Sequence, residues 1–286
     1  MKRYWLDNFL IDDYIISALK EDMNFGDITT DAICSTLDKK NFKVYLTTRN
    51  NGILAGKPVF KRIFELLAKD CVDVEFYFDD GDEIKKGDRI AKIEGDARYI
   101  LAGERLALNF VQKMSGIATH SRKFQEIADK YGVKVVDTRK NTPNFRIFEK
   151  YAAKIGTNHL HRFNLSDCVM LKDNHIALYD NSIAKAVKEV RNNISHAHKI
   201  EVECDTIKQV QEALDCNVDI IMLDNMSLDE MRECVKLINK KAIVEASGCV
   251  NLDNIESIAK TGVDIISTSA IVTKAPTLDL AFDYIK

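Results

Sequence analysis

The chain is poor in residues and patterns that mark specialised classes of protein. Its 286 residues include three prolines and one tryptophan, and no apolar run approaches the roughly 20 residues that cross a membrane. Its 41 basic and 44 acidic side chains leave a formal net charge of −3. This balance indicates neither nucleic acid nor a membrane as a partner, so we expect a protein that binds neither.

The cysteines do not form any metal-binding or disulfide pattern. There are seven, scattered along the chain and never spaced as Cys-x-x-Cys: Cys34, Cys71, Cys168, Cys204, Cys216, Cys234 and Cys249. Such a set predicts neither a disulfide framework nor a zinc site. The first residues, MKRYWLDNFLIDD, acquire acids too early for a secretory signal. We therefore expect a cytoplasmic protein with reduced thiols.

The first part of the chain mixes helical and strand patterns without a regular repeat. Residues 4–20 and 59–70 have apolar residues at helical spacing, and 72–78 alternates as a strand does. Residues 42–56 predict a strand, an Asn-Gly turn and a second strand. The turn-rich stretch 78–95 resembles biotinyl and lipoyl carrier hairpins but lacks their lysine signature, so we assign it to a small mixed sheet.

A long helical passage over residues 97–130 follows, and we expect it to break near Gly116. Beyond Gly132, apolar strand candidates alternate with helical stretches. The last four strands begin near residues 199, 218, 241 and 263, and the helical stretches are 206–215, 227–240 and 251–262. Capping residues at Ser227 and Asn251 and a glycine at Gly262 support two of these helices.

This alternation predicts a parallel sheet covered by helices. An open doubly wound sheet and an α/β barrel both fit the number of strands. Polar residues recur at every strand's C-terminal end, where barrel enzymes bind their ligands, and this favours the barrel.

Cationic side chains follow two of the apolar runs. Arg139 and Lys140 come after VVDT, Lys172 comes after CVML, and Arg146 and the pair His161-Arg162 lie between them. Any one of these is most simply a solvated loop charge. Several beside strand ends predict a site for an anionic substrate, a carboxylate or a phosphate.

The later strand ends carry acids and then small residues. Glu203 and Asp224 end neighbouring strands, and oxygen ligands of this kind suit Mg²⁺ or sugar hydroxyls; pairing with nearby lysines is the structural alternative. Small uncharged residues follow the last two strands: Ser247, Gly248, Ser267, Thr268 and Ser269. Such residues let backbone N–H groups approach a phosphate, although a glycine here is also ordinary turn chemistry.

Six stretches, in this order, resemble the quinolinate phosphoribosyltransferase family: DTRKNTP, HRFNLSDCVMLKDNHI, IEVECDT, IIMLDNMS, VEASGCVNLDNI and TGVDIISTSA. FGDITT, GILAG and GERLALNFVQKMSGIAT look like the same family's N-terminal domain, so the likeness covers most of the chain. The resemblance implies an α/β fold with an N-terminal α/β sandwich domain over 1–115 and a TIM-like, incomplete α/β barrel over 116–274. Residues 275–286 are expected to pack back on the first domain.

The resemblance also implies a reaction and roles for the site residues. Phosphoribosyl pyrophosphate (PRPP) and quinolinate would give nicotinate mononucleotide, CO₂ and pyrophosphate, with Mg²⁺ as cofactor and a homodimer as the working unit. The expected quinolinate ligands are Arg105 (from the partner subunit), Arg139, His161, Arg162 and Lys172. The expected PRPP ligands are Lys140, Glu203, Asp224, Ser247, Gly248, Ser267, Thr268 and Ser269. Glu203 and Asp224 would also serve Mg²⁺, directly or through water, and the catalytic set would be Lys140, Lys172, Glu203 and Asp224.

Three stretches depart from the family's usual pattern. Residues 156–160 (GTNHL) replace a glycine-rich run, Ser247-Gly248-Cys249 replaces Ser-Gly-Gly, and TSAIVTKAP replaces a GALTHS-like loop. Two alternatives therefore stay open: a paralogous transferase acting on another pyridine or aromatic carboxylate, and a non-catalytic barrel that binds an anionic metabolite. The intact KDNH motif argues against the first, and Glu203 with Asp224 argues against the second.

Overall fold

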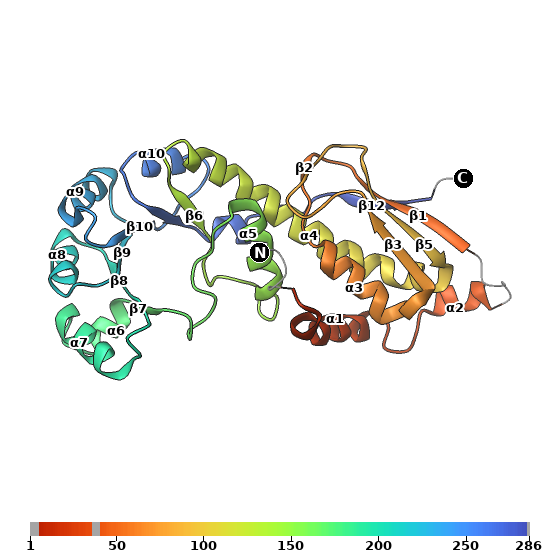
Figure 1. Ribbon diagram of the computed structural model, residues 1–286, viewed down its shortest axis with the longest axis horizontal. Coiled ribbons are helices and arrows are strands. Elements are labelled where there is room, and N and C mark those ends of the chain that lie inside the picture. Colours follow the sequence, from red (N-terminus) through yellow and green to blue (C-terminus); the bar gives the residue numbers. More distant parts are fainter. Residues whose placement is uncertain (1–5, 36–40, 285–286) are drawn as a thin grey trace. The chain divides into compact units, whose positions relative to one another are not determined.

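The computed structural model describes residues 6–35 and 41–284, which form two compact units (Figure 1). Unit 1 contains the described residues within 1–122, 142–156 and 275–286, and unit 2 contains Lys123–Asn141 and Thr157–Lys274. Neither unit is one continuous stretch, because the chain leaves unit 2 after its first strand and later returns to it. The domain limits predicted at residues 115 and 274 stay predictions.

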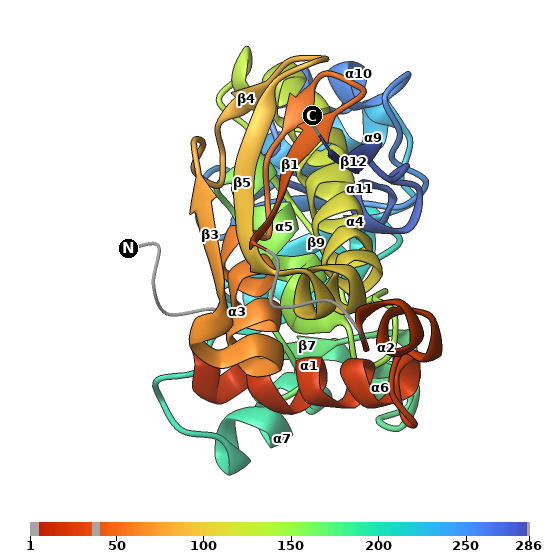
Figure 2. The same ribbon diagram turned by 90° about the vertical axis from the view of Figure 1, so that its right-hand side faces the viewer.

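Unit 1 is built on a four-stranded sheet of order β12-β1-β5-β3, seen in Figure 2. Its strands are β1 (Asn41–Thr48), β3 (Val72–Phe76), β5 (Arg89–Asp96) and β12 (Leu280–Asp283). All the pairings are antiparallel, so the expectation of a mixed sheet is wrong. The connection from β3 to β5 contains no crossover helix, which a parallel pair would need.

Helices and a small ribbon complete unit 1. The elements are α1 (Asn8–Asp22), α2 (Ile28–Cys34), α3 (Lys57–Ala68), a 3-10 turn (Lys69–Cys71), β2 (Gly52–Ile53), β4 (Glu83–Ile84) and α5 (Arg146–Thr157), whose last residue already belongs to unit 2. α3 packs on the sheet through Phe60 and Phe64, whose buried rings contact Phe282 of β12. The helix predicted over 4–20 is α1, and the first two residues of that range lie outside the described part of the chain.

The strands on either side of the Asn-Gly turn form, but they do not pair with each other. β2 pairs with β4, whereas β1 pairs with β5 and β12. Gly52 lies against other parts of unit 1, because a Cβ there would come within 2.9 Å of the Thr119 and Leu278 side chains. These long-range contacts, rather than the local turn, determine the path of the chain.

The helix α4 (Ala97–Asp129) is continuous, so the predicted break near Gly116 is wrong. The glycine is required by packing: a Cβ at this position would lie 2.0 Å from the carbonyl oxygen of Pro276. Its missing side chain lets the segment before β12 run close against the helix. A glycine inside a helical pattern marks such close approaches as well as breaks.

Unit 2 is a curved parallel sheet of six strands: β6 (Lys134–Val136), β7 (Val169–Leu171), β8 (Ile200–Cys204), β9 (Ile220–Asp224), β10 (Ile243–Ser247) and β11 (Ile265–Ser267). Neighbours follow chain order from β7 to β11, and β6 then pairs with β11. A doubly wound sheet reverses its order at a switch point, whereas this order returns to its beginning. No pairing joins β6 to β7 among the described residues, so the predicted incomplete barrel is confirmed.

The helices after β7 complete unit 2, and α6 to α10 lie outside its strands in Figure 1. They are α6 (Asp173–Ala177), α7 (Ile183–Asn193), α8 (Ile207–Asp215), α9 (Leu228–Ile238), α10 (Ile255–Ala259) and α11 (Ala270–Thr273). The predicted cap at Ser227 is confirmed, because its side chain accepts the N–H of Glu230. α10 is shorter than predicted: the Asn251 side chain accepts backbone N–H groups of a preceding turn. Across the described residues, we find no helix with the length and apolar character to span a membrane.

Candidate active site

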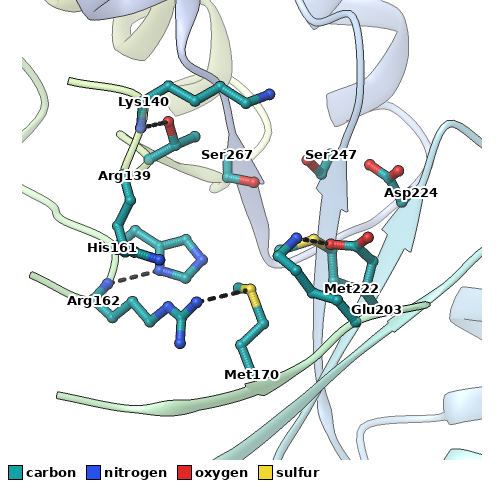
Figure 3. Close-up of a pocket in the computed structure, with 12 residues that line it drawn as sticks. Arg139, Lys140, His161, Arg162, Met170, Glu203, Met222, Asp224, Ser247 and Ser267 are labelled. Carbon is teal, nitrogen blue, oxygen red and sulfur yellow. Dashed lines mark hydrogen bonds and ion pairs between the residues drawn. The ribbon is translucent and has the colours of Figure 1, made fainter. Parts of the chain in front are cut away.

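A cavity of about 460 Å³ lies at the C-terminal ends of the strands in unit 2 (Figure 3). Twelve residues line it: Thr138, Arg139, Lys140, His161, Arg162, Met170, Lys172, Glu203, Met222, Asp224, Ser247 and Ser267. Nine of these are predicted site residues, and the other three are Thr138, Met170 and Met222. Every strand of the barrel contributes, and this is the face where barrel enzymes bind their ligands.

Cations occupy one part of this cavity. The guanidinium of Arg162 is fixed by its own loop, donating to the Cys168 carbonyl at 2.9 Å and to the Met170 sulfur at 3.4 Å. Arg139 and the exposed Lys140 lie in the loop after β6. A fixed guanidinium beside further cations is a good receptor for a carboxylate or phosphate.

Acidic groups occupy another part. Glu203 and Asp224 end the neighbouring strands β8 and β9, and both face the cavity in Figure 3. The Lys172 ammonium contacts the Glu203 carboxylate, and Asp224 accepts a 2.8 Å hydrogen bond from the Asn225 side chain. Two carboxylates that keep free lone pairs are the ligand types that bind Mg²⁺ together with water and phosphate oxygens.

The imidazole of His161 lies deeper, against two buried acids. Its Nε2 is 3.2 Å from a Glu245 oxygen and 3.6 Å from a Glu201 oxygen, and the two glutamates are 3% and 1% exposed. Burial alone lowers the pKa of His161, but the hydrogen bonds and charges of the glutamates outweigh it and raise the pKa to about 10. Burial has the opposite effect on Glu201 and raises the pKa of its carboxyl group. These contacts favour a ring proton on Nε2, which faces both carboxylates.

The position of that proton follows from the other ring nitrogen. Nδ1 of His161 accepts the backbone N–H of Arg162 at 2.7 Å, so it carries a lone pair. The ring proton is then on Nε2, directed at the two glutamates.

Four of the predicted residues do not line the cavity. Gly248 has φ +100°, and a Cβ on it would lie 2.1 Å from the Asn225 side-chain oxygen. The buried Thr268 hydroxyl donates to the Val250 carbonyl, and the Ser269 carbonyl accepts helical N–H groups of α11. Arg105 lies in α4 and Arg146 lies in α5, and both residues belong to unit 1. The functional roles of the four, Arg105, Gly248, Thr268 and Ser269, stay predictions.

The sequence contained a signal for the residues that were missed. Met170 precedes Lys172 by two residues, Met222 precedes Asp224 by two, and Glu245 precedes Ser247 by two. In a strand, residues i and i+2 point to the same side. A residue two positions before a predicted strand end therefore faces the barrel interior, one layer of side chains below the site.

Comparisons with known proteins agree with this geometry. The family models of the quinolinate phosphoribosyl transferase N-terminal and C-terminal domains match residues 27–115 and 117–283. This chain belongs to the quinolinate phosphoribosyltransferase family. The order of its motifs predicted that membership, which is confirmed.

Relatives from distant organisms are similar over nearly the whole chain. A probable nicotinate-nucleotide pyrophosphorylase (carboxylating) of Synechocystis is 42% identical over 97% of this chain and 93% of its own. The rat nicotinate-nucleotide pyrophosphorylase (carboxylating) is 34% identical over 93% and 88%. The crystal structure of NadC from Streptococcus pyogenes is 39% identical, covers 98% of this chain and 99% of its own, and superimposes with a TM-score of 0.92.

Proposed function

We propose that this protein is a pentosyltransferase of NAD biosynthesis. It transfers the phosphoribosyl group of PRPP to the ring nitrogen of quinolinate, with loss of the 2-carboxylate, and yields nicotinate mononucleotide, CO₂ and pyrophosphate. The observation that carries the proposal is the single cavity in which Arg139, Arg162 and Lys172 lie beside Glu203 and Asp224. A cavity lined by cations alone could bind any dianion. Carboxylates in the same cavity also favour a reaction in which the substrate develops positive charge.

The chemistry needs both kinds of charge. The bond from ribose C1 to the pyrophosphate oxygen breaks, and its electron pair leaves with pyrophosphate. The sugar becomes oxocarbenium-like, and nearby carboxylates such as Glu203 and Asp224 stabilise that charge. The lone pair of the pyridine nitrogen then forms the new bond to C1, and the nitrogen becomes cationic.

Decarboxylation follows from that positive charge. The bond from C2 to its carboxylate breaks, CO₂ leaves, and the electron pair stays on C2 next to the cationic nitrogen. A proton then takes the place of the lost carboxylate. Arg139, Arg162 and Lys172 orient the two carboxylates of quinolinate during nitrogen attack, so the cations contribute by positioning the substrate.

Mg²⁺ fits the donor set proposed for it. Glu203 and Asp224 are two oxygen donors on adjacent strands, which is the small protein share of a typical Mg²⁺–phosphate site. When bound, the ion neutralises charge on the departing pyrophosphate. Lys140 is exposed at the rim of the cavity, in the loop after β6, and we expect it to bind the same phosphates.

We further propose that two copies act together in the cytoplasm, with Arg105 completing the partner's quinolinate site. Unit 1 exposes large apolar side chains that association would bury: Phe9, Phe25 and Ile28 are 92%, 94% and 82% exposed. Arg105→Ala and Lys172→Ala should each lose most of their activity when assayed alone at a quinolinate concentration near the wild-type KM. Mixed chains should regain part of the activity, and failure to do so would refute the shared site.

The deciding experiment supplies quinolinate, PRPP and Mg²⁺ and follows nicotinate mononucleotide and CO₂ together. Equal amounts of both products are expected. Product from nicotinate but not quinolinate would refute the decarboxylation while keeping phosphoribosyl transfer. Binding of PRPP without turnover of either acid would indicate a different aromatic substrate.

A further inference from the structure

The imidazole of His161 is held by the protein at both of its nitrogens. Nδ1 accepts the Arg162 N–H at 2.7 Å, and Nε2 lies 3.2 Å from Glu245 and 3.6 Å from Glu201. The three side chains are 8%, 3% and 1% exposed. Because both nitrogens face protein groups, this ring acts on the site mainly through what it holds in place.

The same residue ties a loop to three strands. The backbone N–H of His161 donates to the Asp137 carboxylate, just past β6, at 3.1 Å. Its ring reaches Glu201 on β8 and Glu245 on β10. The next residue is Arg162, whose guanidinium is directed into the cavity (Figure 3). The position of that guanidinium therefore depends on how His161 is anchored.

Burying the carboxylates of Glu201 and Glu245 destabilises the fold, and a role of these residues in the site would explain why they are present. Met170 and Met222 line the same interior and are apolar. Two buried carboxylates beside one imidazole are usually no more stabilising than apolar residues of similar volume. Folding alone gives no reason for glutamates at these two places.

We infer that Glu201 and Glu245 are positioning residues of the quinolinate site: by holding Nε2 of His161 they fix the loop that carries Arg162. This rests on the proposed function, because it assigns quinolinate to Arg162. Without the anchors the loop shifts, and a displacement of about 1 Å is enough to weaken a directed contact about 100-fold. Glu203 and Asp224, assigned to PRPP, lie outside this loop, on β8 and β9.

The test compares Glu245→Leu with Glu245→Gln, and Glu201→Leu with Glu201→Gln. Leucine has a similar volume but accepts no hydrogen bond, whereas glutamine keeps an acceptor oxygen for the Nε2 proton. The leucine variants should raise the KM for quinolinate about 10-fold to 100-fold, with little change in the KM for PRPP. The glutamine variants should restore most of the quinolinate affinity.

The control is Val244→Ala, which removes buried volume from the same strand but leaves His161 and its anchors intact. It should lower the thermal stability without changing either KM. Two results would overturn the inference. One is a rise in the quinolinate KM of Val244→Ala as large as that of Glu245→Leu. The other is an equal rise of the quinolinate KM and the PRPP KM in the leucine variants.

A second measurement separates this inference from the proposed function. A wild-type protein that does not turn over quinolinate would refute the function, and nitrogen NMR of the histidine side chains would still test the anchor. His161, identified by the signal lost in His161→Asn, should show a protonated Nε2 and a lone-pair Nδ1. Loss of the Nε2 proton on adding Zn²⁺ would mean that the cluster, whose ligand atoms lie within 4.8 Å of one another, is a metal site, and would overturn the inference.

Discussion

The ammonium group of Lys172 lies on the carboxylate of Glu203, so a cation proposed for quinolinate is paired with an acid proposed for PRPP. The lysine side chain is 42% exposed and the glutamate 15%, so the pair faces the cavity and incoming ligands can reach it. In the proposed reaction, a quinolinate carboxylate would compete with Glu203 for this ammonium. The two halves of the site are therefore connected before any ligand binds.

Replacing Lys172 with methionine should raise the KM for quinolinate by about 10-fold to 100-fold, the value of one charge-assisted hydrogen bond of about 1.5–3 kcal/mol. Methionine keeps the length of the side chain and removes only the charge. Steady-state kinetics at saturating PRPP measures the change. The matched control is Lys185→Met, which removes an exposed lysine paired with Asp180 in the same unit and should leave both KM values unchanged.

Replacing Gly248 with alanine should raise the KM for PRPP and spare the KM for quinolinate. A Cβ at this φ of +100° would lie 2.1 Å from the Asn225 side chain and 2.9 Å from the Asn225 nitrogen, next to Asp224. Gly132→Ala is the control, since it places alanine at φ +69° with nothing within 4 Å. If both variants bind PRPP equally well, the loop after β10 has no part in phosphate binding.

Replacing Gly116 with alanine should destabilise the protein although alanine favours a helix by roughly 0.5–1 kcal/mol. The new methyl group would meet the Pro276 carbonyl at 2.0 Å, and overpacking of this kind costs about 1–3 kcal/mol. Thermal unfolding measures the loss. Lys123→Ala, at an exposed position of the same helix, should leave the melting temperature nearly unchanged, and an equally stable Gly116→Ala would contradict the close approach.

Replacing Asp12 with asparagine should lower stability by at most about 1 kcal/mol at pH 7. Asp12 accepts two 2.8 Å hydrogen bonds from Arg62, which join α1 to α3. These hydrogen bonds, against the effect of burial and with the help of the Arg62 charge, lower the pKa of Asp12. A lowered pKa stabilises the fold above the unfolded value of about 4, and this gain is lost as the pH falls through the folded pKa. The difference from wild type should therefore vanish in strong acid, and Asp13→Asn, at an exposed neighbour that leaves the Asp12–Arg62 contact intact, is the control.

The barrel was predictable because its strands are buried on both faces. Runs such as IIMLD and IVEAS are continuously apolar and end in a polar residue, so each strand end is located almost to the residue. Arg139, Lys172 and Asp224 were named for that reason. The convergence of these residues in one cavity follows from parallel strands sharing one C-terminal edge.

Contacts between distant parts of the chain were not predictable in the same way. α5 has clear helical spacing, yet its place in unit 1 depends on contacts such as the 2.6 Å hydrogen bond from Tyr151 to Asp80. Glu245 is a single acid inside an apolar run, and nothing local indicates that it meets His161. Pairings of this kind are a property of the folded topology.

The pairing of β1 with β12 has a consequence for how the chain acquires its structure during synthesis. Thr47 lies opposite Ala281, and their strands are separated in sequence by the whole of unit 2. The ribosome must therefore finish the barrel before unit 1 can close its sheet, and until then one edge of β1 is unpaired. An unpaired edge is prone to join strands of other nascent chains. This part of the newly made protein is where we expect a chaperone to bind.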